Sequence, residues 1–242
     1  MRIYHLLKNE FDIVKDSERL YENYMNKKHI KRELLLSESF LKSEKSKFEY
    51  LLEKLTKMLL TQEAYNEKTW QINIIDILKI IFPKYIHVLP EVPVSDYHNN
   101  KKRKIDFLLV DFNGNIDIIE IKRPSDNQII SDSNNYRENY LPLRELSGSI
   151  MQIEKYLFHL NKGGKTGEEK INNYFHKHID SKMNIKIINP LGIIIIGRDK
   201  GLNENQINDF EVIKRKYKNI VDIITYDDLI RRLEQLIIKY SE

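Results

Sequence analysis

Three charged residues, Asp106, Glu120 and Lys122, stand in two apolar segments where a buried strand would normally carry Val or Ile. Two carboxylates offer hard oxygen ligands to Mg²⁺, and a lysine beside them can reach a water or a phosphate oxygen as a point charge. Metal-dependent hydrolysis of a phosphodiester requires this set of groups. The alternative is an ordinary ion-paired hairpin, because an Asp followed by Glu-x-Lys at this spacing occurs often by chance.

The sequence around these charges predicts a β-hairpin. The apolar runs Ile105–Val110 and Ile116–Ile121 flank the step Asn113-Gly114, and both of its residue types tolerate positive φ. A type I turn that starts at Asp111 and ends in a bulge at Gly114 places all three charges on one face of the sheet. A two-residue Asn-Gly turn does not, because a shift of one residue turns every side chain to the other face. We predict the one-face arrangement.

The composition indicates a globular protein that contains this hairpin. The chain has 242 residues, of which 41% are hydrophobic, enough for one globular domain with an appendage. It has no cysteine, which excludes disulfides and thiolate zinc sites. We expect a cytoplasmic protein without a membrane segment, because no signal-peptide core and no apolar stretch of membrane length is present. The net charge of +4 is too small to indicate a nucleic-acid binder by itself.

The first part of the chain predicts a helical N-terminal extension over residues 1–45, made of one or two helices. We interpret its basic residues as a solvated face; they are Lys27, Lys28, Lys31 and Arg32. A further helix is expected to begin near Ser46 and to open the main domain, residues 46–242.

The next helix is predicted over Glu67–Phe82, ended by Pro83. Its start, or the residues just before it, can supply Glu67 or Glu63 as a further carboxylate near the site. An N-terminal partner of the helix dipole is an equally good explanation of such a residue.

A strand over Tyr85–Val94 and a polar loop over Ser95–Lys104 are expected to lead into the hairpin. The loop ends in four consecutive basic residues: Lys101, Lys102, Arg103 and Lys104. They are suited to contact a phosphate backbone, and a solvated loop tip explains them equally well. After the hairpin, Ser125–Tyr140 is expected to form a mobile loop that faces the substrate, with Tyr136, Arg137 and Tyr140 in it.

A helix over about Pro142–Leu160 puts Gln152 and Tyr156 four residues apart, so that both can point the same way. The following segment, Asn161–Lys170, contains Gly-Lys-Thr but lacks the first glycine of a phosphate-binding loop, and we interpret it as a flexible surface turn. His176 and His178 have no third ligand in view and are not assigned to a metal.

The last third predicts alternating strands and helices. In chain order they are the strand Ile185–Ile196, the helix Glu204–Tyr217, the strand Ile220–Tyr226 and a helix Asp228–Tyr240 capped by Asp227. This order implies parallel pairing through right-handed crossovers. The expected fold class is therefore α/β, with a mixed sheet that has helices on both faces.

Five blocks along residues 47 to 235 resemble the Shedu antiphage-defence nuclease family of the PD-(D/E)xK superfamily. In order they read IDFLLVD, IIEIKRP, LRELSGSIMQIEKY, GIIIIGR and IITYDDLI. The resemblance implies a restriction-endonuclease-like mixed central sheet flanked by helices. The N-terminal extension is short compared with that of larger members of the family.

The resemblance also implies roles for individual residues. Asp106, Glu120 and the carbonyl of Ile121 would bind Mg²⁺, for which Mn²⁺ would substitute, and Lys122 would assist the attacking water. Gln152 and Tyr156 would shape the site, and the helix carboxylate would be Glu67, judged by its distance to Trp70-Gln71. The residues expected to contact nucleic acid are Lys101, Lys102, Arg103, Lys104, Arg123 and Tyr156.

The implied function is a Mg²⁺-dependent DNA endonuclease that nicks or cuts DNA in antiphage defence and assembles as a homo-oligomer. One alternative keeps the fold but acts on RNA or in DNA repair. The other is a non-catalytic module for nucleic-acid binding or assembly, against which the intact Asp, Glu and Lys set argues.

Overall fold

The computed structural model of the chain describes residues 2–97, 99, 101–124, 129–133 and 136–241, without the side chains of residues 2–15, 17 and 32–36. The chain divides into two compact units. One comprises Met1–Tyr50 with Glu234–Glu242, and the other comprises Leu51–Leu233. Each unit is described by itself.

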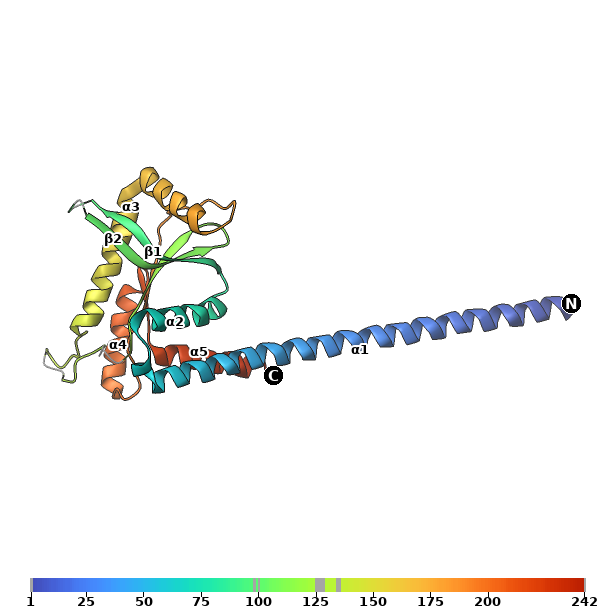
Figure 1. The fold of residues 1–242 in the computed structure, drawn as a ribbon. Coiled ribbons are helices and arrows are strands. Elements are labelled where there is room, and N and C mark those ends of the chain that lie inside the picture. Colours follow the sequence, from blue (N-terminus) through green and yellow to red (C-terminus); the bar gives the residue numbers. More distant parts are fainter. Residues whose placement is uncertain (1, 98, 100, 125–128, 134–135, 242) are drawn as a thin grey trace. The chain divides into compact units, whose positions relative to one another are not determined.

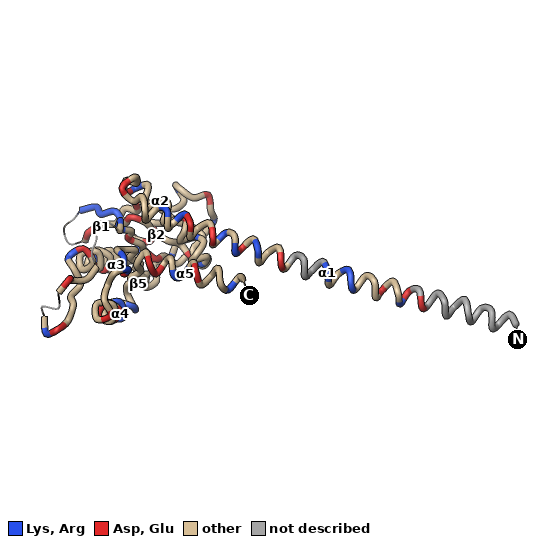
Figure 2. Tube along the Cα trace, turned by 90° about the horizontal axis from the view of Figure 1, so that it is seen from below, with Lys and Arg blue, Asp and Glu red and all other residues tan. Residues whose placement is uncertain are grey.

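The first unit consists mainly of helix α1 (Arg2–Leu60), whose last residues belong to the second unit. Residues 1–60 contain neither Gly nor Pro, so nothing interrupts the helix at Ser46, where a separate helix was predicted to begin. The predicted helix start near Ser46 was wrong. Residues of both charges are interspersed along the described part of α1 (Figure 2), and Lys27, Lys28 and Lys31 are exposed.

The second unit is built on a five-stranded sheet in the order β1-β2-β3-β4-β5. The strands are β1 (Tyr85–Asp96), β2 (Lys101–Asp111), β3 (Ile116–Ile121), β4 (Gly192–Ile195) and β5 (Val221–Ile224). The β1/β2 and β2/β3 pairs are antiparallel, whereas β3/β4 and β4/β5 are parallel. The α/β fold with a mixed sheet is thus confirmed.

Helices cover both faces of this sheet (Figure 1). They are α2 (Glu67–Ile81), α3 (Arg144–His178), α4 (Glu204–Tyr217) and α5 (Tyr226–Lys239). Helices α3 and α4 lie on one face, and α2 lies with the start of α5 on the other. Successive side chains of β3 point to opposite faces of the sheet, so Ile118 packs on the α3 side and Ile119 lines the α2 side.

The turn between β2 and β3 is the predicted one. The backbone N–H of Gly114 donates to the carbonyl of Asp111 at 3.0 Å, and that of Asp111 donates to the carbonyl of Asn115 at 2.9 Å. Gly114 has φ +84°, and a Cβ there would lie 2.3 Å from the carbonyl oxygen of Asn184. Only glycine fits, so the turn fixes the register that the charges need.

Three predicted segments differ from the observed ones. Most of Ser95–Lys104 is strand, because β1 and β2 form a hairpin in which Ser95 pairs with Lys102. The segment Asn161–Lys170 is helical within α3, broken only at Gly164 (φ +50°). The strand predicted over Ile185–Ile196 shortens to β4, although Lys186 still makes an isolated bridge to Asn115.

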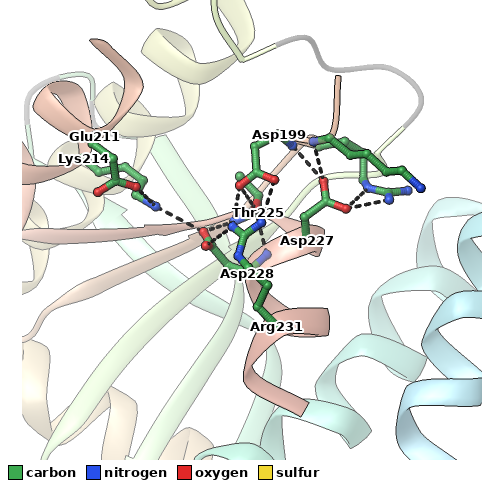
Figure 3. Close-up of polar contacts among 9 residues, drawn as sticks. Asp199, Glu211, Lys214, Thr225, Asp227, Asp228 and Arg231 are labelled. Atoms are coloured by element: carbon green, nitrogen blue, oxygen red, sulfur yellow. Dashed lines mark hydrogen bonds and ion pairs between the residues drawn. The ribbon is translucent and has the colours of Figure 1, made fainter. Parts of the chain in front are cut away.

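The cap of α5 also differs from the prediction (Figure 3). The Thr225 hydroxyl accepts from the Asp228 N–H at 3.0 Å, and the Asp228 carboxylate accepts from the Thr225 N–H at 3.1 Å. Asp227 instead accepts from the Arg198 guanidinium at 2.6 Å and from the backbone N–H groups of Asp199 and Lys200. Thr225 is therefore the cap, and Asp227 ties the loop after β4 to α5.

The predicted mobile loop Ser125–Tyr140 lies partly outside the described residues, which omit 125–128 and 134–135. In the remainder, Ile129 and Ile130 are buried, and the N–H of Tyr140 donates to the Asp209 carboxylate at 2.8 Å.

Candidate active site

The three charged residues of the central hairpin come together at one end of β2 and β3. Pairing of Phe107 with Ile119 places Asp106 and Glu120 at the next opposed positions. The Lys122 Nζ lies 2.6 Å from the Glu120 Oε1, and the Asp106 and Glu120 carboxyl groups lie close enough to shift each other's pKa. The structure therefore brings these residues into one cluster.

Burial gives this cluster unusual electrostatics. Burial and the nearby charge of Asp106, against the opposing effect of Lys122, together raise the pKa of Glu120, which is 2% exposed, to about 7. Burial also raises the pKa of Asp106, although Lys122 and the hydrogen bond from Glu120 work against this. Burial alone would lower the pKa of Lys122, but the Glu120 charge and hydrogen bond outweigh it and the pKa is raised. Two carboxyl groups held this close compete to ionise, and a cation would relieve the competition.

Gln71 on α2 is a site residue that the sequence did not reveal. Its Nε2 donates to the Asp106 Oδ2 at 3.3 Å and to the carbonyl oxygen of Ile121 at 3.2 Å. Its sequence signals are its position four residues after Glu67 on the same helix and the Trp70-Gln71 pair by which Glu67 was chosen.

Gln152 and Tyr156 on α3 point the same way, as their spacing predicted. The Gln152 Nε2 donates to the Glu120 Oε2 at 3.3 Å and to the Tyr156 hydroxyl at 3.1 Å. The hydroxyl of Tyr156, itself 6% exposed, donates to the carbonyl of Lys104 at 2.7 Å. This chain of hydrogen bonds orients Glu120 from the α3 side and anchors it to β2.

The two candidate helix carboxylates occupy different elements. Glu67 is the first residue of α2 and is exposed, and its negative charge contributes to raising the pKa of both Asp106 and Lys122. Glu63 is an exposed residue of the 3₁₀ helix Gln62–Ala64. Glu67 is thus within electrostatic reach of the cluster.

The basic run lies at the start of β2, where Figure 2 shows a blue stretch of the tube. By their contacts the four residues form two pairs, of which Lys101 and Lys102 are exposed. The Arg103 Nε lies 2.7 Å from the carboxylate of Asp96, and the Lys104 Nζ lies 3.1 Å from that of Glu91. Arg123, also expected to contact nucleic acid, donates from Nη2 to the Gln62 carbonyl at 3.4 Å.

A second feature missed in the sequence holds the end of β3 from the α2 side. The Trp70 Nε1 donates to the Tyr226 hydroxyl at 2.7 Å, and that hydroxyl donates to the carbonyl of Lys122 at 2.6 Å. Trp70 and Tyr226 are fully buried. The backbone beside the cluster is therefore fixed from two helices.

The donor set of the cluster fits Mg²⁺. Asp106 and Glu120 offer carboxylate oxygens, and the Ile121 carbonyl points towards the same donor, Gln71, as Asp106 does. Within the described residues, no group of three or more His, Asp or Glu side chains is placed to hold a metal ion. Two carboxylates, a carbonyl and waters suit Mg²⁺ and do not suit Zn²⁺, which prefers nitrogen and sulfur ligands.

The fold and the cluster define an α/β domain with a paired-carboxylate and lysine site at the end of two antiparallel strands. A family model described as the C-terminal part of the Shedu protein SduA matches residues 64–230, and the chain belongs to this family. The chain is 26% identical over 186 residues to Shedu protein SduA of Bacillus cereus (strain B4264), covering 73% of this chain and 44% of that protein. In the described part of the chain, no helix combines the length and apolarity needed to cross a membrane.

Proposed function

We propose that this protein is a Mg²⁺-dependent DNA endonuclease that nicks or cuts DNA in antiphage defence. The observation that carries the proposal is the convergence of Asp106, Glu120 and Lys122, with the pKa of Glu120 raised to about 7. Strongly shifted carboxylates beside a lysine are typical of functional sites. Membership of the Shedu family supports the defence role. A site of the PD-(D/E)xK type, assembly as a homo-oligomer and a cytoplasmic location are further parts of the proposal.

Each residue of the cluster has its own role in the proposed reaction. Asp106, Glu120 and the carbonyl of Ile121 hold the ion, for which Mn²⁺ can substitute. Bound there, Mg²⁺ supplies charge stabilisation at the phosphate and an activated water. Lys122 places a positive charge beside the scissile phosphate and donates to one of its oxygens.

The surrounding residues orient these groups. Gln152 holds the Glu120 Oε2, and Gln71 holds the Asp106 Oδ2 and the Ile121 carbonyl. Oriented ligands lose less entropy when the ion binds, so outer partners of this kind tune both affinity and rate. Lys101 and Lys102 bind the DNA backbone without reading sequence.

Cleavage of supercoiled plasmid by the purified chain in Mg²⁺, Mn²⁺ or EDTA tests the proposal. We expect nicked or linear product with either metal, none in EDTA, and none from Asp106→Ala. Asp222→Ala is the matched control, because Asp222 is an exposed aspartate of β5. Equal cleavage by the parent protein and by Asp106→Ala would contradict the assignment.

The same preparation separates the rival functions. Duplex DNA, single-stranded DNA and RNA of one sequence are incubated side by side in Mg²⁺. Preferential cleavage of RNA would favour the alternative that keeps the fold with another substrate. Tight binding without cleavage of any of the three would favour the non-catalytic module.

A further inference from the structure

A cavity of about 470 Å³ opens directly beside the candidate active site. It lies between α2, the β1/β2 pair and the C-terminal part of α3, and it shares Asp106 and Gln71 with the site. A substrate strand whose phosphate lies at the active-site cluster therefore has its neighbouring groups at the mouth of this cavity.

Part of the cavity wall is apolar and aromatic. Ile72, Ile75 and Phe107 line it, and Ile72 is 48% exposed although it is a large apolar residue. Tyr174 and His178 also line it, with their rings stacked at 4.1 Å and 29°. The Tyr174 hydroxyl donates to the carbonyl of Pro90 at 3.0 Å, which fixes this ring pair against β1. The cavity thus offers flat apolar surface and a rigid aromatic edge.

Both lysines that line the cavity are paired with carboxylates. The Lys79 Nζ lies 3.5 Å from the Asp76 carboxylate, and the Lys68 Nζ lies 3.8 Å from that of Glu91. A phosphate inside would meet these carboxylates and Asp106 together, so its burial there is unfavourable. A neutral, planar group with hydrogen-bonding edges fits the mixed lining better.

We propose that this cavity binds one unstacked nucleobase of the strand whose phosphate occupies the active site. The inference rests on the proposed nuclease function and adds to it a base-binding subsite. A base next to the scissile phosphate leaves its stack and lies against Ile72 and the Tyr174–His178 pair. Stacking of this kind tolerates every base, so the subsite positions the strand and imposes little sequence preference.

The test compares two duplexes that differ only in which strand lacks a base. In one, an abasic residue sits in the cut strand beside the scissile phosphate; in the other, it sits opposite, so that an orphan base remains in the cut strand. Both duplexes lose the same base pair, and only the second keeps a base that can enter the cavity. Affinities are measured by fluorescence anisotropy in EDTA, where no cleavage occurs, and the position is scanned along both sides of the mapped cut.

We expect the orphan-base duplex to bind about five- to a hundredfold more tightly at one position, the range measured for one stacked base. Ile72→Trp fills the cavity and should bring the ratio of the two duplex affinities close to one. Ile86→Trp is the matched control, because Ile86 is also 48% exposed and lies on β1 outside the cavity lining. The Ile86→Trp variant should keep the affinity ratio of the parent protein. Should Ile72→Trp unfold, Ile72→Gln removes the apolar wall without filling the space and should lower the ratio.

The outcomes separate this inference from the nuclease proposal. A parent protein that cuts DNA, but whose ratio stays near one at every position, overturns the base subsite and leaves the nuclease standing. A ratio that Ile72→Trp and Ile72→Gln leave unchanged also overturns it, because the base then lies elsewhere. A parent protein that neither binds nor cuts DNA in Mg²⁺ overturns both.

Discussion

The side-chain amide of Gln71 donates a hydrogen bond of 3.3 Å to the carboxylate of Asp106. The same nitrogen donates to the carbonyl of Ile121 at 3.2 Å, so two oxygens from neighbouring strands converge on one donor. Convergent hard oxygens are what a Mg²⁺ site needs. Gln71 holds these two oxygens together and adds no positive charge, so the negative charge of the carboxylates remains available to bind a cation.

Replacement of Gln71 by Ala should therefore weaken metal binding. We expect the affinity for Mn²⁺ to fall about 10- to 100-fold, the usual cost of losing a partner that orients metal ligands. Isothermal titration calorimetry on the DNA-free protein measures this. Gln235→Ala, at an exposed position of α5, is the control. An unchanged affinity in Gln71→Ala would show that the ligands need no such support.

The charged residues of the cluster should affect cleavage and DNA binding differently. Asp106→Ala and Glu120→Ala should abolish cleavage, because each removes an ion ligand. Metal-free DNA affinity should stay level or rise slightly, since a negative charge facing a polyanion is lost. Lys122→Ala should also lose most activity but should bind DNA more weakly, because it deletes a positive charge near the phosphate.

Cleavage rates and anisotropy in EDTA, at equal folded concentration, measure both effects. The opposite directions of the two binding changes are the decisive result. Parallel losses of affinity in all three variants would indicate a structural cluster, because loss of folding weakens binding whatever the sign of the removed charge.

The central hairpin was predictable because its signals are local. Asn113-Gly114 specifies the turn, and the alternation of the strands then fixes which side chains share a face. The hairpin between β1 and β2 was not predicted, because its polar end, Ser95–Lys104, lacks the apolar alternation of a strand. Pairing with a neighbouring strand forms it, and pairing is not encoded in one segment.

The charged members of the site were predictable for a different reason. Asp106 and Glu120 are anomalous in apolar strands, so their types and positions alone attract attention. Gln71 is an ordinary residue on an amphipathic helix, and Tyr226 is an ordinary aromatic residue at the end of a predicted strand. Their roles arise from contacts across 35 and 104 positions of sequence, which local patterns do not record. Likewise, the sequence makes Asp227 a reasonable helix cap. Only the structure shows that its carboxylate accepts from the Arg198 guanidinium instead.

Tyr226→Phe should destabilise the second unit. The change leaves the buried Trp70 N–H and the Lys122 carbonyl without the hydroxyl they share, at a cost of about 1 to 3 kcal/mol. Urea unfolding measures the loss. Tyr136→Phe is the control, because Tyr136 is 58% exposed. Equal stability of Tyr226→Phe and the parent would mean that water replaces the hydroxyl.

The basic run should contribute to DNA binding through Lys101 and Lys102. Replacing both by Gln should reduce the slope of log affinity against log salt by about 0.9 for each phosphate that the protein no longer neutralises. Arg103→Gln should act mainly on stability, since it leaves the buried Asp96, at 1% exposed, without its guanidinium partner. Salt titrations and urea unfolding on both variants separate the two roles. An unchanged slope in the double variant would identify Lys101 and Lys102 as merely solvated.

The raised pKa of Glu120 should make the metal-free protein less stable as the pH rises. Its ordinary value is 4.5 and its folded value is about 7, so between these values the folded state binds more protons than the unfolded state. Stability therefore falls as the pH rises through this window, by up to about 3 kcal/mol. The raised pKa of Asp106 acts in the same direction.

Urea unfolding in EDTA at pH 5 and pH 8 tests this, with Glu120→Gln beside the parent. The parent should lose stability relative to Glu120→Gln between the two pH values, because glutamine does not titrate. Glu169→Gln, at an exposed position of α3, should follow the parent. Added Mg²⁺ should stabilise the parent more at pH 8 than at pH 5, since the ion binds the ionised carboxylates and its binding releases protons. A parent and a Glu120→Gln variant that respond identically to pH would mean that Glu120 is already ionised at pH 5, and the cluster would then carry its negative charge without needing an ion.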